Sequence, residues 1–363
     1  MGDSLHVRVL STSHSEVPTS QLRLCGRPSL IVELRAGGAV FFGEASPLEG
    51  YGDDSFALAE QELRELRLNE VLAAIDLIFA RNEATPEAST PLAMVSQLSE
   101  KFKSPAARFC VEMLVLQAVS HRLHVPVYRL ISPRHAASPL RTSAVVDALS
   151  PAFEQSVSAL MARQVDTFKI KCGRDDEAEI AAIDWLWKKW GTRVHIRLDA
   201  NRAWSQDRAL RFLARLKDVS LEFVEDPTQN VSEWAALLQA HPSFQLAIDE
   251  PLALTEPDES LLEESRAQVL VLKPMALGGF SVCLRWAAVA VSKGRSVCVS
   301  HLFDGPLALD ACAQLAFAIQ SPGIAPGLGD HAALKSYISQ GISPPRCLKQ
   351  DILHSGPPST AAD

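Results

Sequence analysis

The chain has 363 residues, of which 47% are hydrophobic and 21% charged, and its net charge is −8. That length predicts two domains, and the acidic balance argues against a nucleic acid or an anionic membrane surface as a partner. The sequence has no apolar run of about 18 residues that would span a membrane. The 7 cysteines are scattered without a CxxC pair, and residues 1–17 lack the apolar core of a signal peptide, so we expect a cytoplasmic protein with reduced thiols.

Residues 1–135 are predicted to form a small α+β domain. Apolar and polar residues alternate in short runs, as in half-buried strands, and Gly37 and Gly38 supply a hairpin turn between two of these runs. The segment 43–52 is rich in Gly and contains Pro47, which is typical of a mobile loop. The predicted strands are 5–10, 30–35 and 40–43, and helical periodicity predicts helices at 55–66, 69–79 and 105–123.

In residues 136–337, short apolar runs alternate with helical patterns at steps of about 24 to 28 residues, the length of one strand, one helix and two loops. Eight such units close a parallel barrel. The strands are predicted to end near residues 146, 171, 199, 225, 249, 273, 300 and 327, with helices at 177–190, 207–216 and 280–292 between them. The last helix of the series has no clear pattern. We expect 338–355 to return to the first domain and 356–363 to form a flexible tail.

Three acidic residues, Asp199, Glu225 and Asp249, end consecutive predicted strands. In a parallel barrel they would project into one mouth, where three carboxylates would repel each other unless a cation lay between them. Oxygen ligands suit Mg²⁺. The sequence has no HxH, HxxE or Cys pair nearby, which argues against zinc. Each acid alone is more often an exposed residue paired with Lys or Arg, but their matching positions in consecutive units predict a magnesium site.

Three lysines share this mouth. Lys169 and Lys171 are two residues apart on one predicted strand, so they point to the same face, and Lys273 ends the sixth strand. We expect the two neighbouring ammonium groups, together with burial and a metal, to depress the lysine pKa toward neutrality. A substrate on the metal would then have a lysine on each side, an arrangement suited to abstraction of a proton α to a carboxylate.

With these residues in place, residues 40–335 resemble the enolase superfamily, in the branch of the muconate-lactonising enzymes, and resemble most the family of o-succinylbenzoate synthases. The most specific stretch is the run LDANRAW at 198–204. The other stretches that carry the resemblance are GEASPL at 43–48, KIK at 169–171, FVEDP at 223–227, DE at 249–250 and LKP at 272–274.

The resemblance implies an α/β architecture, a modified TIM barrel of (β/α)7β type under an α+β capping domain. It implies Mg²⁺, with Mn²⁺ able to substitute, on Asp199, Glu225 and Asp249. It assigns acid/base catalysis to Lys171, a base or cation on the opposite face to Lys273, and a supporting role to Lys169. We expect the loop 44–52 to close over the mouth and exclude water. The residues expected to bind the substrate are Gly50, Tyr51, Asn201, Ser300, His301 and Gly327.

The reaction implied is syn dehydration of a small carboxylate, 2-succinyl-6-hydroxy-2,4-cyclohexadiene-1-carboxylate, to 2-succinylbenzoate in menaquinone biosynthesis. Muconate cycloisomerases, N-acylamino acid racemases and dipeptide epimerases use similar lysines and are the alternatives. Epimerases resemble one another in an Asp-x-Asp at the eighth strand, where this chain has GLGD at 327–330. A barrel that only binds a ligand is a third class, and the intact lysines and acids argue against it. The oligomeric state is left open.

Two features near the seventh strand depart from the family patterns. His301 is similar to the base of the mandelate-racemase branch, but that branch pairs the histidine with an Asp on strand six, where this chain has Lys273. We therefore interpret His301 as a substrate-contacting or structural residue. The run SHLFDG at 300–305 also differs from the Ser-rich version in the synthases, which bears on how the succinyl chain would be bound.

Overall fold

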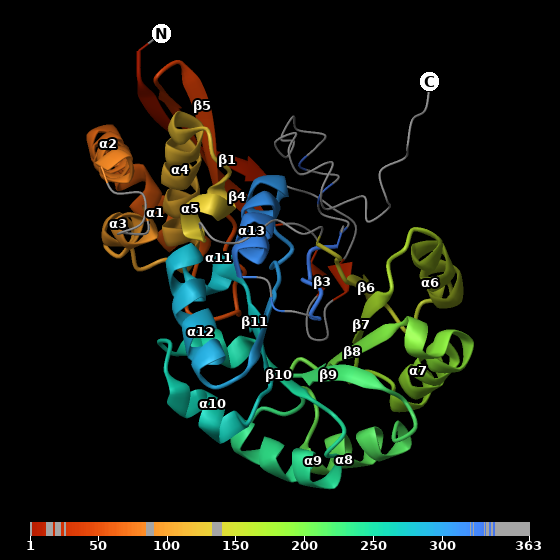
Figure 1. Ribbon diagram of the computed structural model, residues 1–363. Helices are drawn as coiled ribbons and strands as arrows, with labels where there is room; N and C mark the ends of the chain where they lie inside the picture. The colour runs from red at the N-terminus through yellow and green to blue at the C-terminus, as the bar shows by residue number, and fades with distance from the viewer. Residues whose placement is uncertain are drawn as a thin grey trace.

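The computed structural model describes most of the chain, as two parts that lie against each other. Figure 1 shows a curled parallel sheet with helices outside it, and a second part in which helices pack on an antiparallel sheet. This is a TIM-barrel-like fold with an N-terminal capping domain, as the sequence predicts. The described residues are 2–11, 17–18, 23–24, 27–84, 91–132, 140–319, 321, 323–329, 331, 334 and 337, so the predictions for 338–355 and 356–363 lie outside them.

The capping domain is built on the sheet order β1-β4-β5, in which both pairs are antiparallel. The hairpin between β4 and β5 turns at Gly37 and Gly38, whose φ angles of 59° and 83° favour glycine. The strands are β1 (Ser4–Ser11), β4 (Pro28–Ala36) and β5 (Ala39–Ala45), beside the short pair β2 (Val17–Pro18) and β3 (Arg23–Leu24). The helices are α1 (Phe56–Glu65), α2 (Leu68–Ala84), α3 (Pro91–Ser99), α4 (Pro105–Leu123) and α5 (Val127–Ile131).

The end of β5 corrects one prediction. Residues 43–45 continue the strand, whereas the sequence analysis placed Gly43 and Glu44 in a mobile loop. A Cβ at Gly43 would lie 2.6 Å from both the carbonyl oxygen and the sulfur of Cys110, on α4. This glycine therefore allows helix α4 to pack closely on the sheet, and the loop begins only at Ser46.

The barrel strands follow one another around the sheet in chain order, β6 to β12, and all adjacent pairs are parallel. The strands are β6 (Ala144–Val146), β7 (Thr167–Lys171), β8 (His195–Asp199), β9 (Leu221–Glu225), β10 (Leu246–Ile248), β11 (Val269–Leu272) and β12 (Ser296–Val299). The α-helices are α6 (Phe153–Ala162), α7 (Asp176–Trp190), α8 (Gln206–Arg215), α9 (Trp234–Ala240), α10 (Glu259–Ser265), α11 (Pro274–Leu277), α12 (Phe280–Ser292) and α13 (Pro306–Ile319), with 3-10 turns η1 (Gly191–Arg193), η2 (Val231–Glu233) and η3 (Glu250–Leu254).

The predicted eighth strand is replaced by a short extended segment around Gly327. It forms a single parallel bridge with Ser300 instead of a strand. The Gly327 amide donates to the Val299 carbonyl over 2.8 Å, and the Pro326 carbonyl accepts from the Ser143 amide over 2.9 Å. These bonds reach the two edges of the seven-stranded sheet, so the segment closes the barrel although it is too short to be a strand.

Helix α13 (Pro306–Ile319) is the helix for which the sequence showed no clear pattern. It is regular, and its side chains are buried almost all the way along, between the barrel, α5 and β5. A helix that is covered on every side needs no polar face, so its sequence lacks the 3.6-residue alternation by which a surface helix is recognised.

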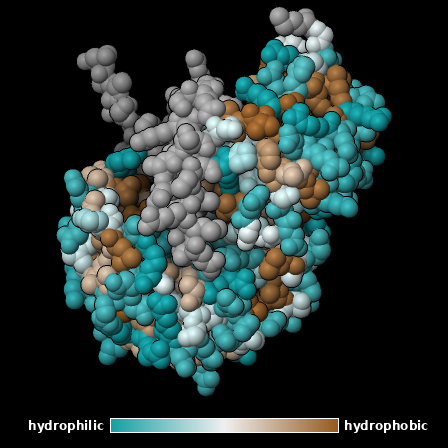
Figure 2. Space-filling model, turned by 180° about the vertical axis from the view of Figure 1, so that it is seen from behind, coloured by the Kyte–Doolittle hydropathy of each residue, from teal (hydrophilic) through white to brown (hydrophobic). Residues whose placement is uncertain are grey.

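The surface of the described residues is mostly hydrophilic on the face shown in Figure 2, and their cysteine thiols are buried. On the face that Figure 2 shows, hydrophobic residues lie in separate groups among hydrophilic ones. In the part of the chain that the structure describes, no helix is long and apolar enough to cross a membrane. Among the described residues, five cysteines are free thiols with buried side chains: Cys110, Cys172, Cys283, Cys298 and Cys312.

The two domains are joined in part by Glu112, a residue of α4 without exposed surface. Its carboxylate accepts a hydrogen bond of 3.2 Å from the Ser281 amide in the first turn of α12, and bonds of the Ser99 and Ser281 hydroxyls. Burial raises the pKa of Glu112 from 4.5 to about 7. The group that caps this barrel helix therefore comes from the capping domain and is titratable near neutral pH.

This raised pKa predicts a dependence of stability on pH. The folded state holds the Glu112 proton more tightly than the unfolded chain, so this stabilisation is complete below pH 4.5 and is lost as the pH rises through 7. We expect the unfolding free energy of the wild type, relative to Glu112→Gln, to fall by about 3 kcal/mol over this range. Urea denaturation of the metal-free proteins between pH 4.5 and 8 measures it, and a constant difference would contradict the expectation.

Candidate active site

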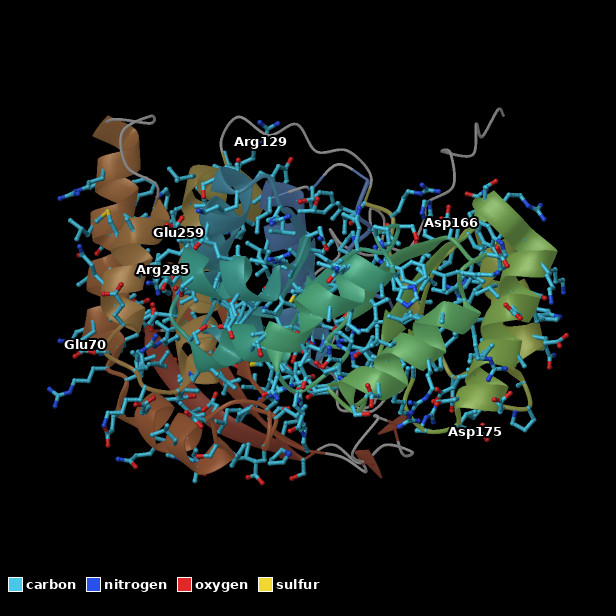
Figure 3. All side chains as sticks on the ribbon, turned by 90° about the horizontal axis from the view of Figure 1, so that it is seen from below. Glu70, Arg129, Asp166, Asp175, Glu259 and Arg285 are labelled. Carbon is cyan, nitrogen blue, oxygen red and sulfur yellow. The ribbon has the colours of Figure 1, made fainter. Side chains whose placement is uncertain are left out.

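The residues predicted to end the barrel strands lie level with one another. Lys171 is the register partner of Asp199, Asp199 that of Glu225, and Glu225 that of Ala247, just before Asp249. Asp175 follows β7 and Asp166 precedes it, and Figure 3 shows Asp175 on the side of the capping sheet. The carboxyl ends of the strands therefore open toward the capping domain.

Each lysine of the predicted set is paired with a predicted metal ligand. The Lys169 ammonium lies between two of them, 2.8 Å from Asp199 Oδ2 and 2.7 Å from Glu225 Oε1. Lys171 Nζ is also 2.8 Å from Asp199 Oδ2, and Lys273 Nζ is 2.5 Å from Asp249 Oδ2. The three carboxylates are at most 2% exposed, and the lysine ammonium groups that contact them supply the positive charge closest to them.

The electrostatics of this arrangement correct the expected lysine pKa. Burial acts to lower the pKa of Lys169, but Asp199 and Glu225 outweigh it and the pKa is raised. The pKa of Lys273 is raised in the same way, by Asp249 against burial and the nearby Lys169 charge. The prediction that proximity and burial depress the pKa was wrong for Lys169 in this arrangement, because it left out the carboxylates that contact the ammonium group.

The carboxylates form a donor set that fits Mg²⁺. Burial, and then the neighbouring Asp199 charge, raise the pKa of Glu225 to about 7, and a cation bound beside it would favour its ionised form. All three ligands would be carboxylate oxygens, which Mg²⁺ prefers. Among the residues that the structure describes, no three His, Cys, Asp or Glu side chains already form an arrangement that could hold a metal ion. A metal bound here would compete with the Lys169 ammonium for the Asp199 and Glu225 oxygens that it contacts.

Two acids next to the predicted ligands complete the site, and the sequence analysis gave them no role. Asp226 is buried and accepts hydrogen bonds from the Asp249 amide over 3.1 Å and from the Glu250 amide over 2.8 Å. Glu250 accepts from the Asn201 amide group over 3.4 Å. Asp226 thus fixes the turn that carries Asp249, and the Glu-Asp-Pro order at 225–227 was the available sequence signal.

The chain matches a family of known proteins. The family model described as Enolase C-terminal domain-like matches residues 152–346, more than half of the chain and all but the first barrel strand. The chain belongs to this family. The matched residues include every predicted lysine and carboxylate of the site.

Several relatives of this enolase-superfamily chain are characterised. It is 27% identical over 341 residues to an o-succinylbenzoate synthase of Desulfotalea psychrophila, covering 86% of this chain and 88% of that one. The crystal structure of MenC from the same organism matches 92% of this chain and 95% of its own, with a TM-score of 0.74 and 24% identity. A dipeptide epimerase of Enterococcus faecalis, crystallised with Mg and L-Leu-L-Tyr, matches 90% of this chain and 89% of its own, with a TM-score of 0.69 and 20% identity.

Other enolase-superfamily enzymes are also similar in sequence. Muconate cycloisomerases and dipeptide epimerases are 23% to 28% identical to the chain. The comparisons therefore show an enzyme of this superfamily, a class whose relatives act on small carboxylates with dehydration, cycloisomerisation or epimerisation.

Two of the expected substrate-binding residues contact the lysines of this superfamily member. Asn201 Oδ1 accepts a hydrogen bond of 2.6 Å from Lys171 Nζ. The Tyr51 hydroxyl donates to Asp249 Oδ1 over 2.6 Å, and Lys273 Nζ lies 3.3 Å from the same hydroxyl. Tyr51 belongs to the segment 46–52, which we call the lid, so the lid reaches the barrel mouth as predicted.

The remaining expected residues lie differently. The Ser300 hydroxyl donates to the Gly327 carbonyl over 3.2 Å, so these two residues join the barrel closure and need not contact a substrate. Gly50 is exposed, with a φ of 84°, and serves the turn of the lid. His301 is stacked on His331 at 4.7 Å between ring centroids, and burial and the positive groups around it lower its pKa well below 6.5. His301 is therefore a neutral imidazole.

The lid is expected to respond to ligands. With Mg²⁺ and a carboxylate ligand bound, Tyr51 must leave or share Asp249, and the lid should close over the ligand. We expect amide hydrogen exchange in 46–52 to slow by roughly 10-fold or more on ligand binding. Exchange in α4 is the internal control, and equal protection of the lid with and without the ligand would contradict the role.

Proposed function

We propose that this chain is an o-succinylbenzoate synthase, which dehydrates 2-succinyl-6-hydroxy-2,4-cyclohexadiene-1-carboxylate to 2-succinylbenzoate. The observation that carries the proposal is the pair Lys171 and Lys273. Lys171 ends β7 and Lys273 directly follows β11, four strands further around the barrel, and each contacts a different buried acid, Asp199 and Asp249. Such a pair suits removal of a proton α to a carboxylate. The choice of substrate is supported by the relative that is similar over most of both chains.

In this proposal Asp199, Glu225 and Asp249 would hold Mg²⁺, which when bound makes the proton next to a carboxylate more acidic. Lys171, as its neutral amine, removes that proton, and the ammonium group so formed gives it to the departing hydroxyl on the same face, so that a C–H and a C–O bond break, a C=C bond forms and water leaves. The hydrogen bond from Lys171 to Asn201 orients this amino group. Lys273 places a positive charge on the other face, where negative charge develops on the substrate. Formation of an aromatic ring drives the reaction.

The alternatives of the same superfamily are a cycloisomerase, an N-acylamino acid racemase or a dipeptide epimerase. All would use the same lysine pair, and 28% identity to the L-Ala-D/L-Glu epimerase of Bacillus subtilis over 58% of the chain keeps this class as the second candidate. The Gly327-Leu328-Gly329 run, where epimerases resemble one another in an Asp-x-Asp, favours the synthase.

The deciding test is an assay of the purified protein with Mg²⁺ and the cyclohexadiene acid. We expect an aromatic absorbance to appear at a kcat/KM within the usual range for enzymes, about 10⁴ M⁻¹s⁻¹ or higher. Muconate, N-acylamino acids and dipeptides are tested in parallel. Faster turnover of any of them than of the cyclohexadiene acid would replace the proposal by that activity.

A further inference from the structure

Glu44, near the end of β5, reaches from the capping domain to the start of barrel helix α13. Its side chain has no exposed surface. Its Oε1 accepts a hydrogen bond of 2.6 Å from the Gly305 amide, and its Oε2 accepts one of 3.2 Å from the Ala308 amide. Amides at the start of a helix have no acceptor within the helix. The side chain of the residue just before the helix usually accepts a hydrogen bond from one of them. Here that residue is Gly305, and a carboxylate 261 positions away in the chain takes its place.

The close approach explains why position 305 is glycine. A Cβ there would lie 2.6 Å from both carboxylate oxygens of Glu44 and 2.5 Å from the Tyr337 ring. A side chain at 305 that capped the helix by itself would therefore exclude Glu44. Glu44 can cap α13 only because residue 305 has no side chain.

On the capping side, Glu44 is tied to the root of the lid. The Ser46 hydroxyl donates to Glu44 Oε1 over 2.9 Å. The backbone amide of Ser46 donates to the sulfur of Met275 over 3.3 Å, and Met275 is two residues after Lys273. The lid therefore leaves β5 from a residue that is held by Glu44 and by helix α11, which begins directly after Lys273.

On the barrel side, the same carboxylate holds the end of the loop 300–305. Within this loop, Asp304 accepts from the Leu302 amide over 3.1 Å and pairs with Arg27 at 3.0 Å. His301 Nδ1 accepts from the Phe303 amide over 2.9 Å, which leaves the proton of the neutral ring on Nε2. The loop that carries His301 is thus held in place by residues of the capping domain, Glu44 and Arg27.

We propose that Glu44 is a positioning residue: by capping α13 from the capping domain, it sets the root of the lid and the His301 loop in one fixed arrangement at the barrel mouth. The lid root and the His301 loop then take their positions only when the two domains dock against each other. The inference rests on the proposed function only in taking this mouth as the place where the substrate binds.

Glu112 provides a matched control. It too is a fully buried glutamate of the capping domain that accepts an amide bond at the start of a barrel helix, α12, and there too the helix is preceded by a glycine, Gly279, whose Cβ would meet the carboxylate. It also accepts bonds of the Ser99 and Ser281 hydroxyls. Glu112 therefore shares the burial and the capping role of Glu44, but its hydrogen-bond partners Ser99 and Ser281 belong to α3 and α12 and not to the lid or the 300–305 loop.

The test compares Glu44→Gln with Glu112→Gln at pH 8, above the pKa of about 7 to which burial and Asp304 raise the Glu44 carboxyl. The amide group that replaces the Glu44 carboxylate would set an N–H group against the Gly305 or Ala308 amide. In the Mg²⁺-loaded protein without substrate, we expect Glu44→Gln to speed amide exchange in both 46–52 and 301–308 by roughly 10-fold, which corresponds to about 1.4 kcal/mol. Glu112→Gln should change exchange only in the first turn of α12.

Kinetics supply the second measurement. We expect Glu44→Gln to raise KM about 10-fold, with a smaller change in kcat, because the lysines and carboxylates stay in place while the substrate-binding loops do not. Glu112→Gln should keep the wild-type KM even where its melting temperature falls as much. Gly305→Ala, which pushes Glu44 away from the barrel side, should reproduce the exchange pattern, and it replaces Glu44→Gln should that variant not fold.

The outcomes separate this inference from the proposed function. Exchange in 46–52 and 301–308 that stays at the wild-type rate in Glu44→Gln or Gly305→Ala would overturn the positioning role, whatever the substrate. Equal changes in 301–308 in Glu112→Gln would overturn it as well, since loss of domain docking in general would then explain them. A protein inactive on the cyclohexadiene acid leaves the exchange experiment, which needs no substrate, to decide.

Discussion

Lys171→Ala is expected to lower kcat by roughly 10³-fold or more and to abolish exchange of the substrate α-proton with solvent deuterium. A syn dehydration needs one group that takes the proton as a neutral amine and gives it back as an ammonium, and Lys171 Nζ, 2.6 Å from Asn201 Oδ1 and 2.8 Å from Asp199 Oδ2, is positioned for that task. Turnover by absorbance and deuterium incorporation by NMR measure the two effects. Lys188→Ala is the control, since it removes the same charge from a side chain that is 78% exposed.

Lys273 should behave differently from Lys171, because its role in the proposal is to supply a positive charge. Lys273→Arg keeps that charge beside Asp249 and should retain more activity than Lys273→Ala, whereas Lys171→Arg should be as inactive as Lys171→Ala. In a two-base racemase, either single alanine variant would still exchange the α-proton of one enantiomer. Stereospecific exchange by Lys171→Ala would therefore reject the one-base dehydration and favour the racemase.

Removal of the metal is the second large effect that we expect. EDTA should abolish activity, and Mg²⁺ or Mn²⁺ should restore it, because three buried carboxylates would otherwise be neutralised only by lysines that the reaction needs. Asp249→Asn should weaken Mg²⁺ binding by about 100-fold or more. Loss of a residue that only supports a metal ligand costs about 10- to 100-fold in affinity, and loss of a ligand itself should cost more. Isothermal titration of the metal-free proteins with Mg²⁺ measures this without any assay of activity.

A surface acid supplies the control for the metal experiment. Asp218→Asn makes the same chemical change at an exposed position in the turn after α8, and Mg²⁺ should bind to it as to the wild type. Crystals soaked in Mg²⁺ that show no density between Asp199, Glu225 and Asp249 would remove the site. Density there, with Lys169 moved away from Glu225, is the expected result, because the ammonium now lies between two of the ligands.

The sequence by itself determined the barrel and which charged residues gather at its mouth. Strands β7, β8 and β9 end at Lys171, Asp199 and Glu225, the residues at which the apolar runs were predicted to end. Strand and helix periods are local properties of the chain, and the carboxyl ends of neighbouring parallel strands meet at one edge whatever the details of packing. Charged residues at those ends could therefore be placed together without coordinates.

The tertiary structure alone decided how the mouth is held and covered. Glu44 meets the Gly305 amide across 261 positions and Tyr51 meets Asp249 across 198, so no local pattern relates them. Glu44 was predicted to be a mobile loop residue because glycines surround it, yet Gly43 is there for packing on Cys110. Helix α13 escaped detection because it is buried on all sides. Contacts between the domains depend on how two folded surfaces fit, and the physical signals in the sequence are confined to neighbours along one helix or strand.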